Sequence, residues 1–391
     1  MRARKADRKE MRRLAGALAL ALAAGAASGC ASAFASLLPD PLLTPDGFPC
    51  RADAAGRVRR VPTPGPGGKP VHLAVEERGE GTRESLLVLI HGVFSDRRVW
   101  RLMAADLERD HDLLLVDLAG CGESDAPDPE ALGPGGYSPE SQARRVLEAL
   151  RAALADRAPT TRLVLAGHSL GGAVVLRMLG DAGLRAEFAD IVGRVERAVL
   201  VAPLDASFVQ PAPGLRAVAE ASGLEVDLGN LFGMVREGTA EAVLDGVADR
   251  SSALREDADQ YAEILSDPAR RRATQAMILA AVPLRPDLRP DWEGAARIEA
   301  DYRRIAVPCL VVWGARDETL PCAMGYKLAV QLPDARLAVV ERGMHGLPTE
   351  RPWTCARLVR TFLEGEIGDL PASGAADPQL SDVRVVARVG P

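Results

Sequence analysis

A serine stands at the centre of a glycine-rich segment, GHSLG, at residues 167–171. The apolar residues 163–165 predict a short buried strand before this segment, and residues 173–179 have the apolar spacing of a helix after it. The glycines permit a tight reversal that lifts Ser169 out of the strand end. Its hydroxyl then lies at a helix N-terminus, where the free N–H of Leu170 can stabilise negative charge. This arrangement predicts a nucleophilic serine; the alternative is an ordinary glycine-rich turn.

Two further residues could complete the chemistry of acyl transfer. A serine nucleophile needs a base that takes its proton and a carboxylate that orients the base. His345 follows the last predicted strand, in ERGMHGLPTERP, and Asp317 follows the strand before it, in VVWGARDETLP. The sequence therefore predicts Ser169 as the nucleophile, His345 as the general base and Asp317 as the acid.

Other titratable residues compete for these roles. Asp205 also follows a predicted strand and is the main alternative to Asp317 as the acid. Asp117 follows a strand as well, but it precedes the serine in the chain. We expect His168 to be a packed or hydrogen-bonded residue rather than the base.

Short apolar segments alternate with amphipathic ones along most of the chain. Strands are expected in VHLAVEERGEG, ESLLVLIHG, HDLLLVDLAG, RLVLAG, VERAVLVAP, VPCLVVWG and ARLAVVERG, with helices such as SPESQARRVLEALRAAL between them. This alternation predicts an α/β fold with a mostly parallel twisted sheet covered by helices on both faces. The core of the fold is expected over residues 70–204 and 301–366.

Residues 205–300 break this alternation. They contain helical, charged and proline-punctuated segments such as ALREDADQYAEILSD and RRRATQAMILAAV, and no pattern of a parallel strand. We expect an inserted helical cap over the carboxyl edge of the sheet. Residues 367–391 are rich in Gly, Asp and Pro and predict a flexible tail.

Residues 1–29 are basic and then apolar, which is the layout of a secretory signal peptide. Their end, ASGC, resembles the box recognised in bacterial lipoprotein processing, although Ala27 stands where leucine is usual. The resemblance implies that Cys30 is lipidated and anchors the protein in the cell envelope, with residues 30–69 as a flexible linker. The alternative is cleavage near the small-residue segment AFA, which would release a soluble secreted or periplasmic protein.

Composition excludes several classes of function. The chain has 391 residues, 47% of them hydrophobic, and a formal net charge of −6. Its strongly basic segment is confined to the extreme N-terminus, so no nucleic-acid partner is expected. The five histidines do not cluster and no cysteine spacing resembles a zinc site, so the sequence predicts neither a metal nor a cofactor.

Cysteine pairing stays open at this stage. Five of the six cysteines lie beyond Cys30, and this odd number leaves at least one unpaired even in an oxidising compartment. Cys322 follows the predicted acid loop and Cys355 begins the helix after the histidine loop. The fold could join these two in a disulfide; the alternative is two free buried thiols.

Five motifs resemble those of the α/β-hydrolase family, in the family's order and over residues 70–366. GHSLG resembles the nucleophile turn, GARD the acid turn and MHGLPTERP the histidine loop. His91 and Gly92, after an apolar strand, resemble the family's oxyanion loop. DLAGCGES resembles its D-x-x-G-x-G-x-S segment, with Cys121 where histidine or phenylalanine is common.

The resemblance assigns supporting roles around the nucleophile. It implies that the backbone N–H groups of Val93 and Leu170 form an oxyanion hole. It also implies that His91 and Gly92 support the oxyanion loop, and that Asp117 supports the loop in which it lies.

The nucleophile type narrows the implied chemistry. Relatives that cleave carbon–halogen bonds or open epoxides carry aspartate where this chain has Ser169. The resemblance therefore implies hydrolysis of a small-molecule carboxylic ester, in the manner of a carboxylesterase or lipase, through an acyl-enzyme. Acyl transfer, thioester hydrolysis, carbon–carbon bond hydrolysis and peracid formation remain alternatives, as does a non-catalytic binding protein, and the oligomeric state stays open.

Overall fold

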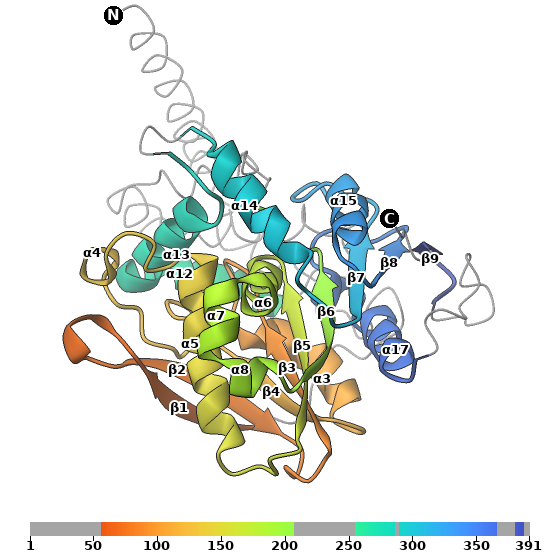
Figure 1. Cartoon of the computed structure of the whole chain (residues 1–391), viewed down its shortest axis with the longest axis horizontal. Helices are drawn as coiled ribbons and strands as arrows, with labels where there is room; N and C mark the ends of the chain where they lie inside the picture. The colour runs from red at the N-terminus through yellow and green to blue at the C-terminus, as the bar shows by residue number, and fades with distance from the viewer. Residues whose placement is uncertain (1–55, 207–254, 286–288, 366–379, 387–391) are drawn as a thin grey trace, which may run out of the picture.

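The computed structural model describes residues 56–206, 255–285, 289–365 and 380–386. Within these residues nine strands form one sheet, in the order β1-β2-β4-β3-β5-β6-β7-β8-β9 (Figure 1). Their bounds are β1 Arg57–Thr63, β2 Val71–Arg78, β3 Ser85–Ile90, β4 Asp112–Val116, β5 Arg162–His168, β6 Val195–Val201, β7 Cys309–Gly314, β8 Ala335–Val340 and β9 Val383–Val386.

The sheet is parallel at its centre and antiparallel at both edges. The strands β4, β3, β5, β6, β7 and β8 are parallel to their neighbours in this series. By contrast, β1 pairs antiparallel with β2, β2 with β4, and β9 with β8. The prediction of an α/β fold with a mostly parallel sheet is confirmed.

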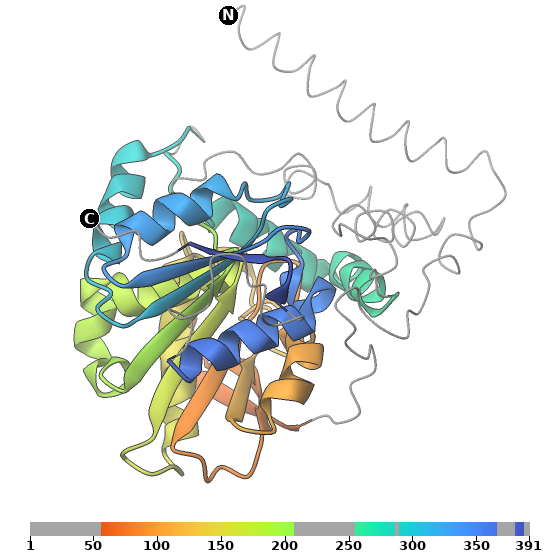
Figure 2. The ribbon, with the colours of Figure 1, turned by 90° about the vertical axis from the view of Figure 1, so that its right-hand side faces the viewer.

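Helices cover both faces of the sheet. In Figure 2, the green α6–α8 and the blue α17 lie on opposite sides of it. One face carries α5 (Pro139–Leu154), α6 (Leu170–Gly180), α7 (Ala182–Glu187), α8 (Ala189–Val192), α14 (Trp292–Tyr302) and α15 (Ala323–Gln331). The other face carries α3 (Arg101–Leu107) and α17 (Pro352–Leu363). Four short helices lie in the loops of the core: η1 Pro66–Gly68, η2 Arg97–Trp100, α4 Pro129–Leu132 and α16 Leu347–Glu350.

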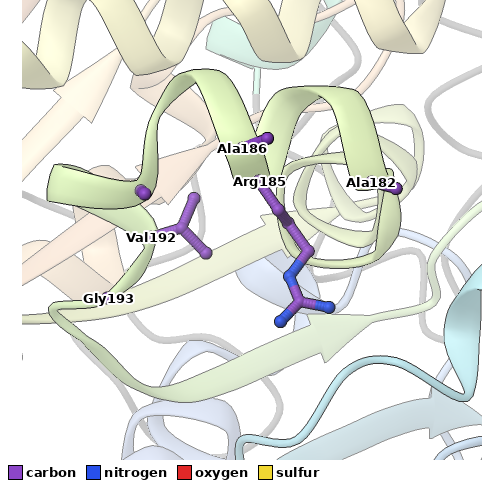
Figure 3. A pocket seen from close by; sticks show the side chains of 6 residues that line it. Ala182, Arg185, Ala186, Val192 and Gly193 are labelled. Atoms are coloured by element: carbon purple, nitrogen blue, oxygen red, sulfur yellow. The ribbon is translucent and has the colours of Figure 1, made fainter.

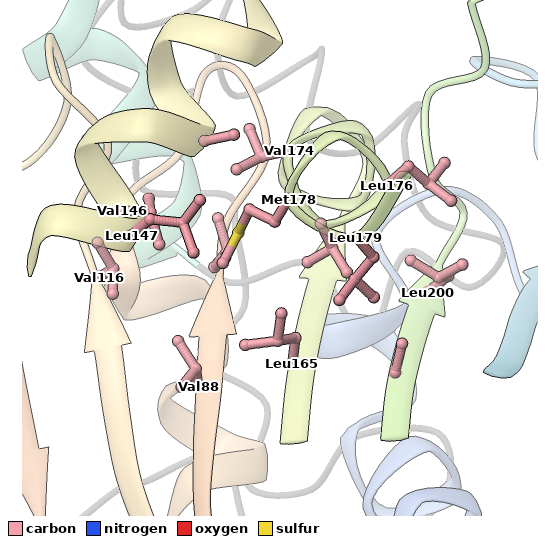
Figure 4. Packing of buried hydrophobic residues seen from close by; sticks show 14 of the residues in the cluster. Val88, Val116, Val146, Leu147, Leu165, Val174, Leu176, Met178, Leu179 and Leu200 are labelled. Carbon is pink, nitrogen blue, oxygen red and sulfur yellow. The ribbon is translucent and has the colours of Figure 1, made fainter. Parts of the chain in front are cut away.

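The central strands are apolar along most of their length because both of their faces are buried. In β3, Val88 and Ile90 join the cluster beneath α5 and α6, whereas Leu87 and Leu89 join the cluster beneath α3 and α17. Successive strand residues point to opposite faces, so an uninterrupted apolar run fits a strand covered on both sides. Figure 4 shows the first cluster, with Val88 on the strand side and Met178 on α6.

The described residues between β6 and β7 are mainly helical. They contain α12 (Arg255–Ser266), α13 (Pro268–Ala280) and α14, and the only β structure described among them is an isolated bridge between Leu284 and Pro290. In Figure 1, α13 and α14 lie toward the carboxyl ends of the parallel strands. Residues 207–254 of the expected cap lie outside the described residues, so the cap at 205–300 stays a prediction.

Polar and steric contacts join α12 and α13 to loops of the core. Arg98 pairs with Glu263 of α12 at 3.1 Å, and the guanidinium of Arg270 on α13 donates to the carbonyl oxygen of Gly122. A Cβ on Gly120 would come within 2.7 Å of Cε of Met277. The two helices therefore lie directly against the core.

The expected flexible linker at 30–69 is wrong for its last part. Residues 57–63 form β1, which pairs with β2 over its whole length, from Arg57 opposite Glu77 to Thr63 opposite Val71. The strand is mostly polar and exposed, with only Val61 and Thr63 buried. Such a strand lies at a sheet edge because of backbone pairing with its neighbour, which the apolar pattern does not reveal.

The expected flexible tail at 367–391 is likewise wrong for residues 380–386. Residues 383–386 form β9, which pairs antiparallel with β8. Leu380 and Val383 are buried in the cluster beneath α3 and α17, with exposed fractions of 0% and 2%. Four residues carry too short a pattern to predict a strand, and the pairing with β8 decides its conformation.

The predicted leader and Cys30 lie outside the described residues. Among the residues that the structure does describe, no helix is long and apolar enough to span a bilayer. Cys322 and Cys355 are both free thiols, so the proposed disulfide between them is absent.

Candidate active site

Ser169 sits in a strained turn between β5 and α6. Its φ is 53° and its ψ −119°, a backbone conformation that residues other than glycine rarely adopt. Two backbone hydrogen bonds to the end of β6 and the segment after it hold this turn: Ser169 N–H donates to Val201 O (3.0 Å), and Leu204 N–H donates to Ser169 O (2.9 Å). The strand and helix predicted around the serine are therefore present, and the serine is lifted between them.

The glycines of this turn are required by close backbone packing. A Cβ on Gly167 would lie 2.3 Å from Gly171 O, and a Cβ on Gly171 would lie 2.2 Å from Ile90 O. Any side chain at either position would therefore displace backbone. The turn packs directly against the end of β3, which brings the loop after β3 to the serine.

The loop after β3 lies against the serine side chain. A Cβ on Gly92 would come within 2.9 Å of Ser169 Cβ and 3.4 Å of Ser169 Oγ. The next residue, Val93, is half-buried, and Leu170 is the first residue of α6, so its N–H has no partner within the helix. Leu170 therefore directly follows Ser169, and Val93 directly follows the glycine that lies against the serine side chain; their role as oxyanion-hole donors stays a prediction.

His91 connects this loop to the segment after β4. It is fully buried; its Nδ1–H donates to Gly92 O at 2.7 Å, and its Nε2 accepts from Leu118 N–H at 3.0 Å. Burial lowers the pKa of His91, against an opposing effect of Asp117, so the ring is neutral near pH 7. The predicted supporting role of His91 has a direct geometric basis in these two bonds.

The structure brings Asp317 and His345 into contact. Oδ2 of Asp317 lies 2.8 Å from Nδ1 of His345, while its Oδ1 accepts the N–H groups of Thr319 (2.9 Å) and Leu320 (2.8 Å). The aspartate side chain is fully buried, whereas 17% of the histidine side chain is exposed. The carboxylate holds the hydrogen of the ring on Nδ1, which leaves Nε2 available to accept a proton.

Close packing joins the loops that carry these two residues. A Cβ on Gly314 would lie 2.3 Å from Met344 O, and Arg316 N–H donates to Gly343 O at 3.0 Å. The N–H of Met344 donates to Oε2 of Glu350, a fully buried carboxylate that sequence reasoning did not single out. The only sequence signal for Glu350 was its place in the histidine motif, MHGLPTERP.

The rival aspartates have other partners. Asp205 is buried; it accepts from the Tyr302 hydroxyl at 3.4 Å and lies 3.8 Å from Nζ of Lys327. Asp117 forms a buried ion pair with Arg97. Neither of these contacts involves His345, which meets Asp317.

His168 lies between the serine turn and the histidine loop. It is 7% exposed, its Nε2 lies 2.9 Å from His345 O, and the two ring centroids are 4.9 Å apart. Burial, with a smaller effect of the nearby His345, lowers the pKa of His168 to about 3. The expectation that His168 is packed and hydrogen-bonded agrees with these contacts.

A separate hollow lies on the surface of α7 and α8. Its volume is about 390 Å³, and its lining residues are Ala182, Arg185, Ala186, Ala189, Val192 and Gly193 (Figure 3). It contains one charged side chain and no nucleophile. It shares no residue with the loops around Ser169 and His345.

The match to a family model agrees with this geometry. The model of the alpha/beta hydrolase family matches residues 87–354, and the chain belongs to this family. A protein of Pseudomonas savastanoi that is provisionally named a carbamate hydrolase is 28% identical over 283 residues, which cover 72% of this chain and 94% of that relative.

Solved structures have the same fold at low sequence identity. A meta-cleavage product hydrolase from Pseudomonas fluorescens is 21% identical, with a TM-score of 0.55, and the match covers 75% of this chain and 95% of that one. A thermophilic esterase from Thermogutta terrifontis is 21% identical, with a TM-score of 0.53, over 80% of this chain and 99% of the esterase.

Proposed function

We propose that this protein is a serine hydrolase that cleaves small carboxylic esters through an acyl-enzyme on Ser169. The observation that carries the proposal is the 2.8 Å contact between Asp317 Oδ2 and His345 Nδ1, next to the strained turn of Ser169. A buried carboxylate that orients an imidazole beside a serine is the arrangement on which serine acyl transfer depends. The chain's membership of the alpha/beta hydrolase family supports the same reaction class.

Acylation follows from the roles of these atoms. Oγ of Ser169 attacks the ester carbonyl carbon while Nε2 of His345 takes the hydroxyl proton, and the carbonyl electron pair moves onto oxygen. Asp317 stabilises the imidazolium that forms. When the tetrahedral intermediate collapses, the carbon–oxygen bond to the alcohol breaks, and the alcohol leaves with the proton from His345.

Deacylation repeats these steps with water. The water attacks the acyl carbon on Ser169 and gives one proton to His345. Collapse of the second intermediate returns that proton to Oγ of Ser169 and releases the carboxylic acid. In both steps the N–H groups of Val93 and Leu170 are proposed to bind the oxyanion, where preorganised donors contribute most.

An apolar cluster next to the oxyanion loop favours an apolar group in the substrate. Phe94 packs with Ile264 of α12 and Ile278 of α13, and the ring of Tyr261 lies 6.0 Å from that of Phe94 between centroids. Residues of the core loop and of the helices above it meet here, and ligand pockets commonly form at such junctions. We therefore propose esters with aliphatic or aromatic acyl groups as substrates.

A fluorophosphonate probe and a panel of p-nitrophenyl esters of increasing acyl length test this function. We expect the probe to label the wild-type protein and not S169A, and at least one ester to be hydrolysed. A p-nitrophenyl carbamate and a meta-cleavage product should accompany the esters, because the relative is named for carbamate hydrolysis and the neighbouring structure for hydrolysis of a meta-cleavage product. A protein that is neither labelled nor active on any of these compounds would contradict a hydrolase and favour a binding function.

We also propose that the mature protein begins at a lipidated Cys30 and works at the cell envelope. The support is the basic and apolar leader that ends in ASGC. Several acyl chains on one residue give stable anchoring, whereas one chain gives marginal binding. Labelled palmitate should enter the wild-type protein and not C30S in a bacterial host, and C30S should leave the membrane fraction or stay unprocessed. An unlabelled, fully soluble wild type would indicate ordinary secretion instead.

A further inference from the structure

His168 makes two contacts with His345 that the proposed proton transfers do not require. Its Nε2 lies 2.9 Å from the backbone oxygen of His345, and the two rings are tilted by 43° with their centroids 4.9 Å apart. Resting on the proposed function, we propose that His168 is a positioning residue. Its Nε2–H holds the carbonyl of His345 and so sets the ring that must meet both Asp317 and Ser169.

The hydrogen-bonding groups assign one tautomer to His168. A carbonyl oxygen only accepts, so the ring hydrogen must be on Nε2. Nδ1 is buried and has no hydrogen-bond partner within the described part of the chain. A second hydrogen there would bury an unpaired N–H together with a positive charge, which is costly. His168 is therefore a neutral donor of a single hydrogen bond.

The position of His168 next to Ser169 means that its contact with His345 joins two loops of the site. His168 is the last residue of β5 and directly precedes Ser169, so its backbone is part of the strained turn. The ring is held on another side by Trp100, which meets it edge-on at 87° with centroids 6.4 Å apart. One residue thus links the nucleophile turn to the histidine loop, as Asp317 links the acid loop to the same histidine.

Small displacements of a general base have large kinetic effects. A shift of about 1 Å in a reacting group can lower a rate by about a hundredfold. If the N–H of His168 sets the position of His345, its removal should lower kcat and leave KM nearly unchanged, because the ester-binding groups remain in place.

A matched pair of variants separates the hydrogen bond from ring packing. His168→Gln keeps an N–H donor at similar reach and removes the ring, whereas His168→Phe keeps a ring and removes the donor. We expect kcat on p-nitrophenyl esters to fall by about tenfold to a hundredfold in H168F and to stay within about threefold of wild type in H168Q. If H168F does not fold, H168M replaces it as the variant without a donor.

The pH profile supplies a readout that a loss of folded protein would not change. A looser contact with Asp317 stabilises protonated His345 less, so the acid limb of kcat/KM should move to lower pH in H168F and not in H168Q. Equal activity in both variants, or equal impairment with an unmoved acid limb, would overturn the proposal.

A measurement without substrate separates this inference from the proposed function. The proton on Nδ1 of His345 lies in the bond to Asp317, and its downfield NMR signal should persist in H168Q and broaden or shift in H168F. An inactive, unlabelled wild type with this NMR pattern would contradict the hydrolase and retain the positioning role. An active wild type whose signal is the same in all variants would contradict the positioning role alone.

Discussion

Asp117 and Asp317 are both buried, and each follows a parallel strand. They differ in the side chain that contacts the carboxylate. Asp117 accepts the N–H groups of Arg97 (2.7 Å) and Glu123 (2.8 Å), and Asp317 accepts those of Thr319 (2.9 Å) and Leu320 (2.8 Å). The backbone therefore holds both carboxylates in a similar way. The remaining contact of Asp117 is the guanidinium of Arg97, and that of Asp317 is the imidazole of His345.

The partner decides what such a carboxylate can do. A guanidinium is charged at every accessible pH, so Arg97 presents a constant positive charge to Asp117, and this charge opposes the rise that burial causes in the pKa of Asp117. An imidazole can accept and release a proton within one reaction cycle, so Asp317 is placed to stabilise a charge that forms on the ring of His345 during a reaction. The same placement after a strand thus serves architecture in one region and, in our proposal, catalysis in the other.

The surroundings of the two aspartates strengthen this contrast. Arg97 also pairs with Glu76 at 3.0 Å, which extends the first region into a buried ionic network. His345 instead meets the neutral ring of His168 and keeps part of its side chain exposed. A buried ionic network suits a loop that must stay fixed, and a partly exposed imidazole suits a group that transfers protons to and from a ligand.

The largest expected effect tests whether the region around Asp317 and His345 is catalytic at all. H345A and S169A should each lower kcat by about 10⁴-fold or more, because neither proton transfer nor the acyl-enzyme remains. Steady-state hydrolysis of the best p-nitrophenyl ester measures this loss, and circular dichroism checks the fold. A drop of less than tenfold in either variant would show that the region around Asp317 and His345 is not catalytic.

The acid residue is tested by exchanging carboxylate for amide. D317N should lower kcat by about 10³-fold or more, since the amide neither stabilises the imidazolium nor favours the correct tautomer. D205N is the matched control, because Asp205 is also buried and follows a strand, and it should change kcat by less than tenfold. A larger loss in D205N than in D317N would reassign the acid.

Substitution of Asp117 should lower the stability of the protein rather than its catalytic rate. D117N removes one of the carboxylates that pair with the buried Arg97, which keeps its pair with Glu76, so we expect the free energy of unfolding to fall by about 1–3 kcal/mol, less than for a wholly unpaired buried charge. Urea unfolding of D117N and wild type measures the difference in free energy of unfolding. Folded D117N should retain kcat within about tenfold; a loss like that of D317N at unchanged stability would erase the distinction between the two aspartates.

The smallest expected effect concerns the contribution of His168 to the pH dependence of stability. The pKa of His168 is lowered to about 3 in the folded protein, from about 6.5 when unfolded. Below pH 6.5 the unfolded chain therefore binds more protons, and the free energy of unfolding falls as the pH falls toward 3. H168Q removes this contribution, so its urea midpoint should fall less than that of wild type between pH 7 and pH 4. Parallel curves for both proteins would show that His168 is not held neutral.

The centre of the sheet was predictable from sequence, whereas its edges were not. Central strands such as β3 and β5 bury both faces, so each appears as a continuous apolar run. β1 is mostly exposed and β9 has only four residues. Both depend on backbone pairing, β1 with the following strand β2 and β9 with β8, more than 40 residues earlier in the chain. Their residues were consequently assigned to a linker and a tail.

The sequence by itself determined the α/β class, the order along the chain of the strands that precede the candidate catalytic residues, and the serine turn with its glycines. These are local properties, because apolar periodicity and glycine placement act within a few residues. Only the tertiary structure decided which aspartate meets His345, since Asp117, Asp205 and Asp317 all follow strands and differ only in what other segments bring to them. The bond from His168 to His345 is of the same kind: it joins residues 177 positions apart in the chain, and side-chain contacts at that separation exist only once the sheet has assembled.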